Sequence, residues 1–264
     1  MSLFISSVFT YDEDAGNYIQ AVETADAQAL EPATRKAINN FVIGCKQDGI
    51  WPAIKASCIL AGARTRLGAL TPLAGTAPDS FNFVDANYNR KTGLIGSTSG
   101  VTAKYIDTNY SEISSAQDNQ HYSLYVSTVP TITNTRFYLS RGDALSGSAC
   151  ILSAGNVFSF RSQSSAVASF TPSIANNVTA TTGFIGARRS SSSTVDARVA
   201  GVSYSGASTS QAPAAGNFMV YSNSPNTSFL NPRLAFYSIG ESLDLALLDA
   251  RVTDLINAFA VTIP

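Results

Sequence analysis

The sequence predicts an α+β protein in which an antiparallel β-sandwich is preceded by a helical segment and followed by one helix. Apolar residues recur at helical spacing before residue 64. Short alternating runs separated by turn residues follow from Phe81, and helical spacing returns after Glu241. The chain therefore divides into an N-terminal helical segment (1–78), a jelly-roll sandwich (79–240) and a C-terminal helix (241–264). We expect that helix to pack on the body or on a neighbouring subunit.

The composition is typical of all-β shells and of extracellular or virion surfaces. Charged residues make up 13% of the 264 residues, whereas an average soluble domain has about 25%. The formal net charge of −1 gives no field of one sign, so we expect no nucleic acid partner. No run of about 18 apolar residues is present, and the start lacks the basic region of a signal peptide. We therefore expect neither membrane insertion nor a cleaved leader.

The first helix is predicted to begin near residue 12. Thr10 and Glu13 have the spacing of a capping box, and Asp12 and Asp14 are alternative caps. The apolar stripe that follows is formed by Ala15, Tyr18, Ile19, Val22, Ala25 and Ala29.

Two more helices are predicted before the sandwich. Pro32 suits the first turn of one helix, which Gly49 ends. Pro52 opens a third, short helix that reaches residue 63. A turn-rich passage over 70–78 then marks the boundary with the sandwich.

Short strands follow at roughly 8–12-residue spacing, which indicates a sandwich or barrel and not βαβ units. The serine runs at 162–165 and 190–193 are interpreted as loop tips. The predicted strands lie at 104–107, 121–128, 135–140, 149–153, 157–161, 182–187, 195–200, 217–221 and 233–238.

The last helix is predicted from a stripe at spacings of three and four, ending near Ala260. Ser238 and Glu241 have capping-box spacing, and Ser242 is an alternative cap. The stripe consists of Leu245, Leu248, Val252, Leu255, Ile256 and Phe259.

No residue pattern indicates catalysis, so we expect no enzyme, metal or cofactor. The single histidine, His121, is interpreted as a structural or surface group of a strand. The three cysteines lack metal-site spacing and are expected to be buried free thiols. Strand-borne carboxylate pairs of the glycosidase kind are absent from the sequence pattern. Glu241, Asp244 and Asp249 are interpreted as the opening turn and solvated face of the last helix.

A small set of polar and aromatic residues could contact a glycan or receptor. Arg188 and Arg189 form a basic spot on a predicted loop, and Tyr204, Tyr221 and Asn223 lie in or beside later loops. Tyrosine offers a stacking face and asparagine a paired donor and acceptor, although both are also ordinary strand and turn residues.

Several segments resemble a module of structural proteins of tailed bacteriophages, including cyanophages. They are YIQAVETADAQALEP at 18–32, FVIGCKQDGIW at 41–51, IKASCILAGAR at 54–64, YNRKTGL at 88–94 and RLAFYSIGESLDLALLDAR at 233–251. The part from 88 to 251 also resembles concanavalin A-like, laminin-G-like jelly rolls, although the carboxylate strand of their glucanase relatives is missing.

The resemblance implies a non-enzymatic virion structural protein: a tail-fibre, tail-tip or capsid-surface component made in the host cytoplasm. Its expected partners are other virion proteins and further copies of itself. The C-terminal stripe together with the resemblance favours a homotrimer. Its polar loops could contact a host cell-surface glycan. A lectin-like glycan-binding module is the alternative function, and a polysaccharide-degrading enzyme is the third.

Overall fold

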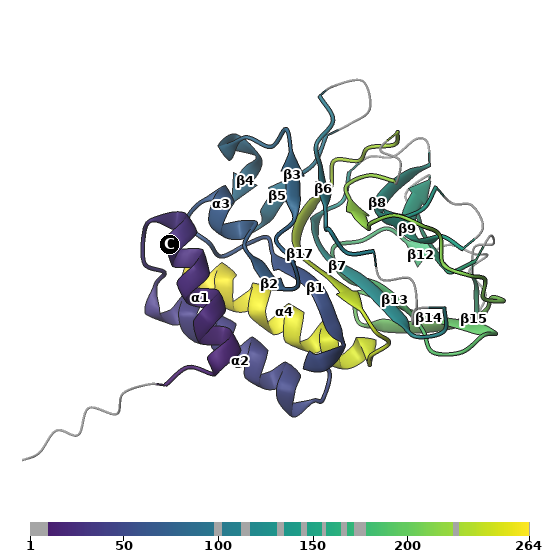
Figure 1. The fold of residues 1–264 in the computed structure, drawn as a ribbon, viewed down its shortest axis with the longest axis horizontal. Helices are drawn as coiled ribbons and strands as arrows, with labels where there is room; N and C mark the ends of the chain where they lie inside the picture. The colour runs from purple at the N-terminus through teal and green to yellow at the C-terminus, as the bar shows by residue number, and fades with distance from the viewer. Residues whose placement is uncertain are drawn as a thin grey trace, which may run out of the picture.

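In the computed structural model, two antiparallel β-sheets form the body of the protein (Figure 1). The structure describes residues 10–97, 102–111, 117–130, 135–143, 147–154, 157–164, 168–171, 178–223 and 227–263. The predicted α+β sandwich with flanking helices is confirmed. In spatial order the larger sheet contains β11 (Ser169–Thr171), β15 (Val202–Ala207), β14 (Thr194–Val199), β13 (Gly183–Arg189), β7 (Gln120–Thr128), β17 (Arg233–Gly240), β1 (Ile54–Ile59) and β2 (Pro72–Ala74). Outside this order, β5 (Gly93–Ile95) pairs with the first residues of β17, and β4 (Tyr88–Asn89) pairs with β5.

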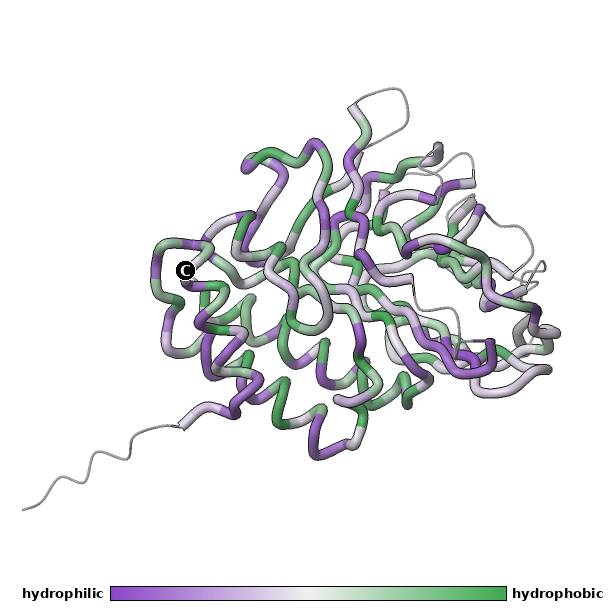
Figure 2. The backbone as a smooth tube through the Cα atoms, viewed as in Figure 1, coloured by the Kyte–Doolittle hydropathy of each residue, from purple (hydrophilic) through white to green (hydrophobic). Residues whose placement is uncertain are grey.

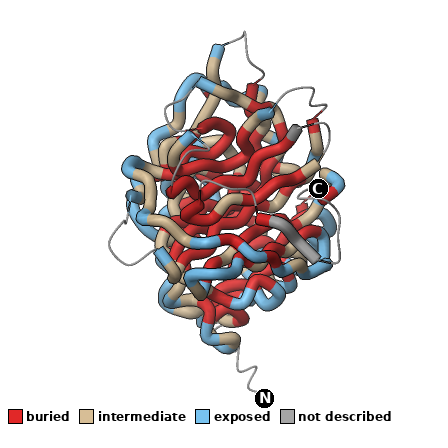
Figure 3. The backbone as a smooth tube through the Cα atoms, turned by 90° about the vertical axis from the view of Figure 1, so that its right-hand side faces the viewer, coloured by how far each residue is buried: buried red, intermediate tan, exposed pale blue. Residues whose placement is uncertain are grey.

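The smaller sheet packs face to face on the larger one. Its spatial order is β12 (Val178–Thr179), β10 (Val157–Ser162), β9 (Ala149–Ala154), β8 (Arg136–Arg141), β16 (Met219–Val220), β6 (Tyr105–Asp107) and β3 (Asp79–Phe81). Alternate side chains of both sheets meet in one buried cluster that includes Leu124, Ile151 and Ile185. Figure 3 shows the buried stretches concentrated in the middle of the molecule, and Figure 2 shows hydrophobic stretches both in the strands and in the helices.

Helices cover the outer face of the larger sheet and form a second apolar cluster there (Figure 1). Asp12, one of the two alternatives to the Thr10–Glu13 capping box, caps the first helix by accepting from the Asp14 amide at 3.0 Å. Pro32 starts the second helix, as predicted. The helices are α1 (Glu13–Asp26), α2 (Pro32–Gln47), α3 (Arg66–Ala69) and α4 (Leu245–Thr262), with 3-10 turns η1 (Trp51–Ala53) and η2 (Asp85–Asn87).

The C-terminal helix packs on its own chain. Leu248, Val252 and Phe259 of its apolar stripe are fully buried against α2 and the larger sheet. The sequence predicts that this helix packs either on the body or on a neighbouring subunit, and the structure shows it on the body. The apolar stripe therefore gives no reason for a second subunit. No described helix is both long enough and apolar enough to cross a bilayer.

The third predicted helix, over 52–63, is wrong. After η1 the chain forms β1, which pairs antiparallel with β17 so that Cys58 lies opposite Tyr237. Ala56 and Cys58 face the sandwich core, whereas Ile54 and Ile59 face the helices. A strand buried on both faces gives a continuous apolar run, and periodicity cannot distinguish such a run from a buried helix.

The predicted caps of the last helix are also wrong. Ser238 lies inside β17, and Ser242 precedes the helix without capping it. Asp244 is the N-cap: its carboxylate accepts from the amides of Ala246 at 2.7 Å and Leu247 at 3.3 Å. The strand therefore runs two residues further than the sequence pattern indicates.

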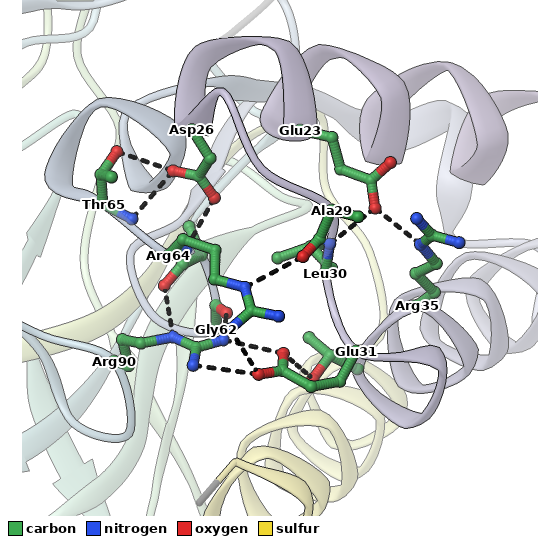
Figure 4. Close-up of polar contacts among 12 residues, drawn as sticks. Glu23, Asp26, Ala29, Leu30, Glu31, Arg35, Gly62, Arg64, Thr65 and Arg90 are labelled. Carbon is green, nitrogen blue, oxygen red and sulfur yellow. Dashed lines mark hydrogen bonds and ion pairs between the residues drawn. The ribbon is translucent and has the colours of Figure 1, made fainter.

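Polar contacts fasten the helical segment to the sandwich (Figure 4). Glu31, between α1 and α2, accepts from the two terminal guanidinium nitrogens of Arg90 at 3.1 and 2.9 Å and pairs with Arg64 at 2.9 Å. Asp26 accepts three bonds from the Arg64 and Thr65 amides and the Thr65 hydroxyl, at 2.6 to 2.8 Å. The Arg90 bonds lower the pKa of Glu31 to about 2. We call Glu31, Arg64 and Arg90 the Glu31 clasp.

A second contact joins α2 to α4. Arg251 binds the Asp48 carboxylate through two bonds of 2.7 and 2.9 Å. Gly44 makes room for this side chain, because a β-carbon there would come within 2.7 Å of the Arg251 Nε. The two helices are thus held together at a point where a larger residue would have to displace the Arg251 side chain.

Candidate functional site

Two hollows lie between α4 and the outer face of β13, β14 and β15, and we call them together the α4 groove. Their volumes are about 350 and about 390 Å³, within the range of small-ligand sites. The Tyr125 hollow is lined by residues that include Tyr125, Phe184, Arg198, Asp249 and Thr253. The Arg188 hollow is lined by residues that include Arg188, Asp196, Arg198, Ser203, Ser205 and Asp244.

Strand alternation places the polar residues of this groove. Val195, Ala197 and Val199 of β14 point into the sandwich core, so the residues between them point outward. Asp196 lies opposite Arg188 of β13, and its Oδ2 accepts from the Arg188 Nε at 2.9 Å. Arg188 also donates to the Leu243 carbonyl at 3.1 Å, which fixes the start of α4 over the sheet.

An ion pair separates the two hollows. The Arg198 Nε donates to the Asp249 Oδ2 at 2.6 Å, and the Asp249 side chain is only 8% exposed. Thr253 donates to the other Asp249 oxygen at 3.0 Å, and Arg198 also donates to the Ser203 hydroxyl at 2.8 Å. Charge-assisted bonds of this geometry hold both side chains in one orientation. The Arg198–Asp249 ion pair therefore forms a rigid wall between the two hollows.

Tyr125 supplies an aromatic wall. It lies on β7, half buried beside the helix cluster. Burial, with a smaller effect of the Asp249 carboxylate, raises the pKa of this phenol, so it is neutral at ordinary pH. Within the described part of the chain no residue bonds to its hydroxyl. The groove therefore offers a ring face and a hydroxyl beside two guanidinium groups and four carboxylates, those of Asp196, Asp244, Asp249 and Asp254.

The structure brings only part of the predicted contact set to this groove. Arg188 and Tyr204 line the Arg188 hollow, but both lie in strands and not in loops. Tyr204 pairs across the sheet with Ala197, a core residue, and its ring packs against the sandwich core. Tyr204 thus borders the groove without presenting its ring to it.

The other three predicted residues are buried. Arg189 alternates with Arg188, points inward and donates to the Ser162 and Ser208 carbonyls, each at 2.7 Å. Tyr221 donates to the Leu94 carbonyl at 2.6 Å. Asn223 accepts from the amides of Thr227 and Ser228 at 2.8 and 2.7 Å. These side chains stabilise strands and a turn and do not reach a surface ligand.

Sequence reasoning missed Tyr125, Arg198 and Asp249. The sequence pattern predicts Asp249 on a solvated helix face, but the residue is buried and paired with Arg198. Alternation along β14 could have placed Arg198 beside Asp196 on the outer face. The position of α4 above that face depends on tertiary packing, which no local pattern reveals.

His121 has a structural role. It is fully buried; its Nδ1 lies 2.6 Å from the Glu241 carbonyl and its Nε2 lies 2.8 Å from the Ser238 hydroxyl. Because a carbonyl only accepts, Nδ1 carries the proton and Nε2 accepts from the serine. Burial lowers the pKa of His121 to about 4, so the ring is neutral at ordinary pH.

The cysteine prediction is confirmed, since Cys45, Cys58 and Cys150 are free and buried. Burial raises the pKa of each thiol to about 12. Among the residues that the structure describes, no three His, Cys, Asp or Glu side chains gather in a metal-binding arrangement.

No family model matches the sequence, and no curated protein matches it. Several solved structures are similar in fold. The binding domain of botulinum neurotoxin DC in complex with SialylT shares 11% identity over 61% of this chain and 41% of its own, with a TM-score of 0.43. A receptor binding domain shares 10% identity over 84% of this chain and 53% of its own, with a TM-score of 0.47.

A domain from an enzyme is similar as well. Domain 4 of AbnA, a GH43 extracellular arabinanase from Geobacillus stearothermophilus, in complex with arabinotriose, shares 14% identity over 77% of this chain and 99% of its own, with a TM-score of 0.40. This chain covers only 41% and 53% of the first two structures. At these identities and TM-scores the likeness carries no argument about what this chain binds.

Proposed function

We propose that this protein is a glycan-binding module and that the α4 groove holds a short saccharide segment. The observation that carries the proposal is the pair of hollows on either side of the Arg198–Asp249 ion pair. Each hollow has room for a small ligand and presents fixed donors and acceptors to it. Sugar hydroxyls act as donor and acceptor at once, so they suit a wall that alternates guanidinium, carboxylate and hydroxyl groups.

The Tyr125 hollow is the stronger half of the site. The ring of Tyr125 offers an apolar face for a sugar ring, and the Tyr125 hydroxyl has no partner among the described residues. Asp249 and Arg198 are already held in place by each other, by Thr253 and by Ser203. A ligand would therefore meet groups whose side-chain entropy is already lost, which favours binding.

Binding to immobilised glycans tests this proposal. The probe is an array of bacterial lipopolysaccharide O-antigens and neutral plant glucans. We expect saturable binding that falls about tenfold or more in Tyr125→Ala and less in Tyr125→Phe, which keeps the ring. Lys36→Ala, exposed on α2 away from the groove, serves as the control. Binding that Tyr125→Ala leaves unchanged in a folded protein would exclude the groove.

The protein acts, in this proposal, by binding and not by cleavage. Glycoside hydrolysis requires one carboxyl group that can deliver a proton and a second that stays ionised. In the α4 groove Asp196 and Asp249 are each engaged by an arginine, and Asp244 accepts from the amides that open α4. Of the described carboxylates that line the groove, only the exposed Asp254 has no bonded partner, whereas the reaction needs a pair. Release of reducing ends from array-positive polysaccharide, lost on Asp249→Asn, would contradict this.

A place on a phage virion is our second proposal, and the sequence resemblance favours it. The segments that resemble tailed-phage structural proteins lie in α1, α2, β1, β17 and α4 and around the Glu31 clasp. They form the helix-covered half of the molecule. We propose a virion-surface subunit that displays the sandwich outward, contacts other virion proteins and assembles as a homotrimer.

Two measurements test the virion proposal. Gold-labelled antibody against this protein is expected to decorate phage particles at the tail or capsid surface. Light scattering is expected to give the mass of three chains. A particle without label would remove the virion role, and a monomer at micromolar concentration would remove the trimer.

A further inference from the structure

An aromatic row crosses the outer face of the smaller sheet, on the side of the sandwich opposite the α4 groove. Phe81 of edge strand β3 stacks on Tyr105 of β6, with ring centroids 4.4 Å apart and planes at 13°. Phe229 continues the row, its centroid 6.1 Å from that of Tyr105. Phe81 is 39% exposed, and the other two rings are half buried. We call these three residues the aromatic row.

Strand register shows that the row faces away from the core. Phe81 lies opposite Tyr105, and the neighbouring residue Ile106 is fully buried in the sandwich core. Side chains on either side of Ile106 therefore point outward. The rings occupy a solvent-facing sheet surface, where they do not contribute to the core.

Polar groups border the row on the same face. Asp79 lies directly opposite Asp107, two residues along the same strands. Asn109 donates to Asp79 Oδ2 at 3.0 Å, and Asn217 donates to Asp107 Oδ1 at 2.8 Å. Within the described chain, the second oxygen of each carboxylate has no hydrogen-bond partner. Like charges directly opposite each other destabilise a sheet, and Asn109 offsets part of this cost because its backbone amide also donates to Asp107 Oδ1 at 2.9 Å.

We propose that the aromatic row and the Asp79–Asp107 pair form a second carbohydrate site, which takes a neutral polysaccharide chain. Ring faces and edges contact the apolar faces of sugar rings, and the free carboxylate oxygens accept from sugar hydroxyls. The two negative charges disfavour uronic-acid and sulfated chains. The site belongs to the same ligand class as the proposed function, but it does not require the α4 groove to bind anything.

Asp79→Asn separates binding from folding. The asparagine can still accept from Asn109 through its carbonyl oxygen, and the charge repulsion with Asp107 is relieved. We expect thermal stability to be unchanged or higher, while affinity for neutral polysaccharide falls about tenfold. Phe81→Ala and Tyr105→Ala are expected to lower affinity by a similar factor through loss of ring contact.

The assay is retardation in native gels that contain β-glucan, galactomannan or dextran, with carboxymethyl cellulose as the anionic comparison. Wild-type retardation by at least one neutral polymer, weakened by the row variants and not by Tyr125→Ala, supports the second site. Retardation that is weakened by Tyr125→Ala and not by the row variants overturns the second site and leaves the α4 groove as the binding site. No retardation by any of the neutral polymers overturns it as well. If Phe81→Ala instead abolishes self-association and leaves retardation unchanged, the row is a contact between copies and the proposal fails.

Discussion

His121 joins two parts of the larger sheet to the start of the last helix. It lies in β7 and bonds to the side chain of Ser238 in β17 and to the main chain of Glu241 beyond it. All of these groups are buried or half buried, and burial keeps the imidazole neutral, with Nδ1 donating to the carbonyl and Nε2 accepting from the serine. The sequence pattern indicates no catalytic role for His121, and the structure shows that it is a hydrogen-bonding bridge.

We expect the stability of the protein to fall on mild acidification because of His121. The folded pKa is about 4, against about 6.5 for a free histidine, so between these values only the unfolded chain binds the proton. Stability is therefore retained above pH about 6.5 and falls as the pH drops toward 4, by up to roughly 3 kcal/mol. Urea unfolding at pH about 7 and about 5 measures this.

His121→Asn is the matched control for that experiment. The amide nitrogen of asparagine can still donate to a carbonyl but does not titrate. We expect this variant to be less stable at neutral pH and to show a flatter dependence between pH 6.5 and 4. A dependence as steep as that of the wild-type protein would assign the effect to carboxylates.

Helix α4 depends on a cap that the sequence pattern did not select. Asp244 satisfies two orphan amides, and Ser242 satisfies none by its side chain. We expect Asp244→Ala to lower the free energy of unfolding by about 1 kcal/mol, and Ser242→Ala to change it by less than about 0.5 kcal/mol. Chemical denaturation of both variants measures the difference. Equal effects would contradict the cap.

The Glu31 clasp gives a second prediction about how elements are joined. Arg90→Ala removes two bonds to Glu31 and two to the carbonyls of Gly62 and Ala63. We expect a loss of about 2–3 kcal/mol, with only partial recovery in Arg90→Lys, because lysine cannot reproduce the paired geometry. The contribution of the pair is present above pH about 4.5 and is lost as the pH falls toward 2. Thermal melts at neutral pH measure the loss; a fully stable Arg90→Ala would show that Arg64 suffices.

Local patterns predicted the elements well wherever only one face of an element is buried. The first two helices, the last helix and most strands of the sandwich have a clear apolar stripe or alternation, and they form as expected. β1 was mistaken for a helix because both of its faces are covered and because Pro52 resembles the first residue of a helix, whereas β7 and β17 are also covered on both faces and were predicted as strands. β15 was overlooked because its burial pattern is mostly exposed, without an apolar run. Both failures therefore depend in part on the environment of the strand.

The candidate site was harder to predict because it forms between distant segments. Arg188 was identified, yet its partner Asp196, the Arg198–Asp249 pair and Tyr125 come together only when α4 lies across the sheet. Arg189, Tyr221 and Asn223 have suitable chemistry for a ligand, but register turns them inward. Side-chain type alone therefore overestimates what reaches the surface.

Packing of α4 on its own body gives a prediction for the molecule as a whole. Leu248 is fully buried in the helix cluster, and Val261 near the chain end is 84% exposed. We expect Leu248→Ala to cost about 3 kcal/mol at all protein concentrations, and Val261→Ala to change stability by less than about 0.5 kcal/mol. Melts over a hundredfold range of concentration check this. A cost that disappears on dilution would place the stripe between subunits.

The position of β17 constrains how the chain can fold during synthesis. This strand lies in the interior of the larger sheet, between β7 and β1, and it also pairs with β5. Until the ribosome has released Gly240, three earlier strands lack their neighbour and the first two helices lack the surface on which they pack. Cotranslational folding can therefore pair the smaller sheet and the part of the larger sheet from β11 to β7, but closure of the whole sandwich waits until β17 has left the ribosome.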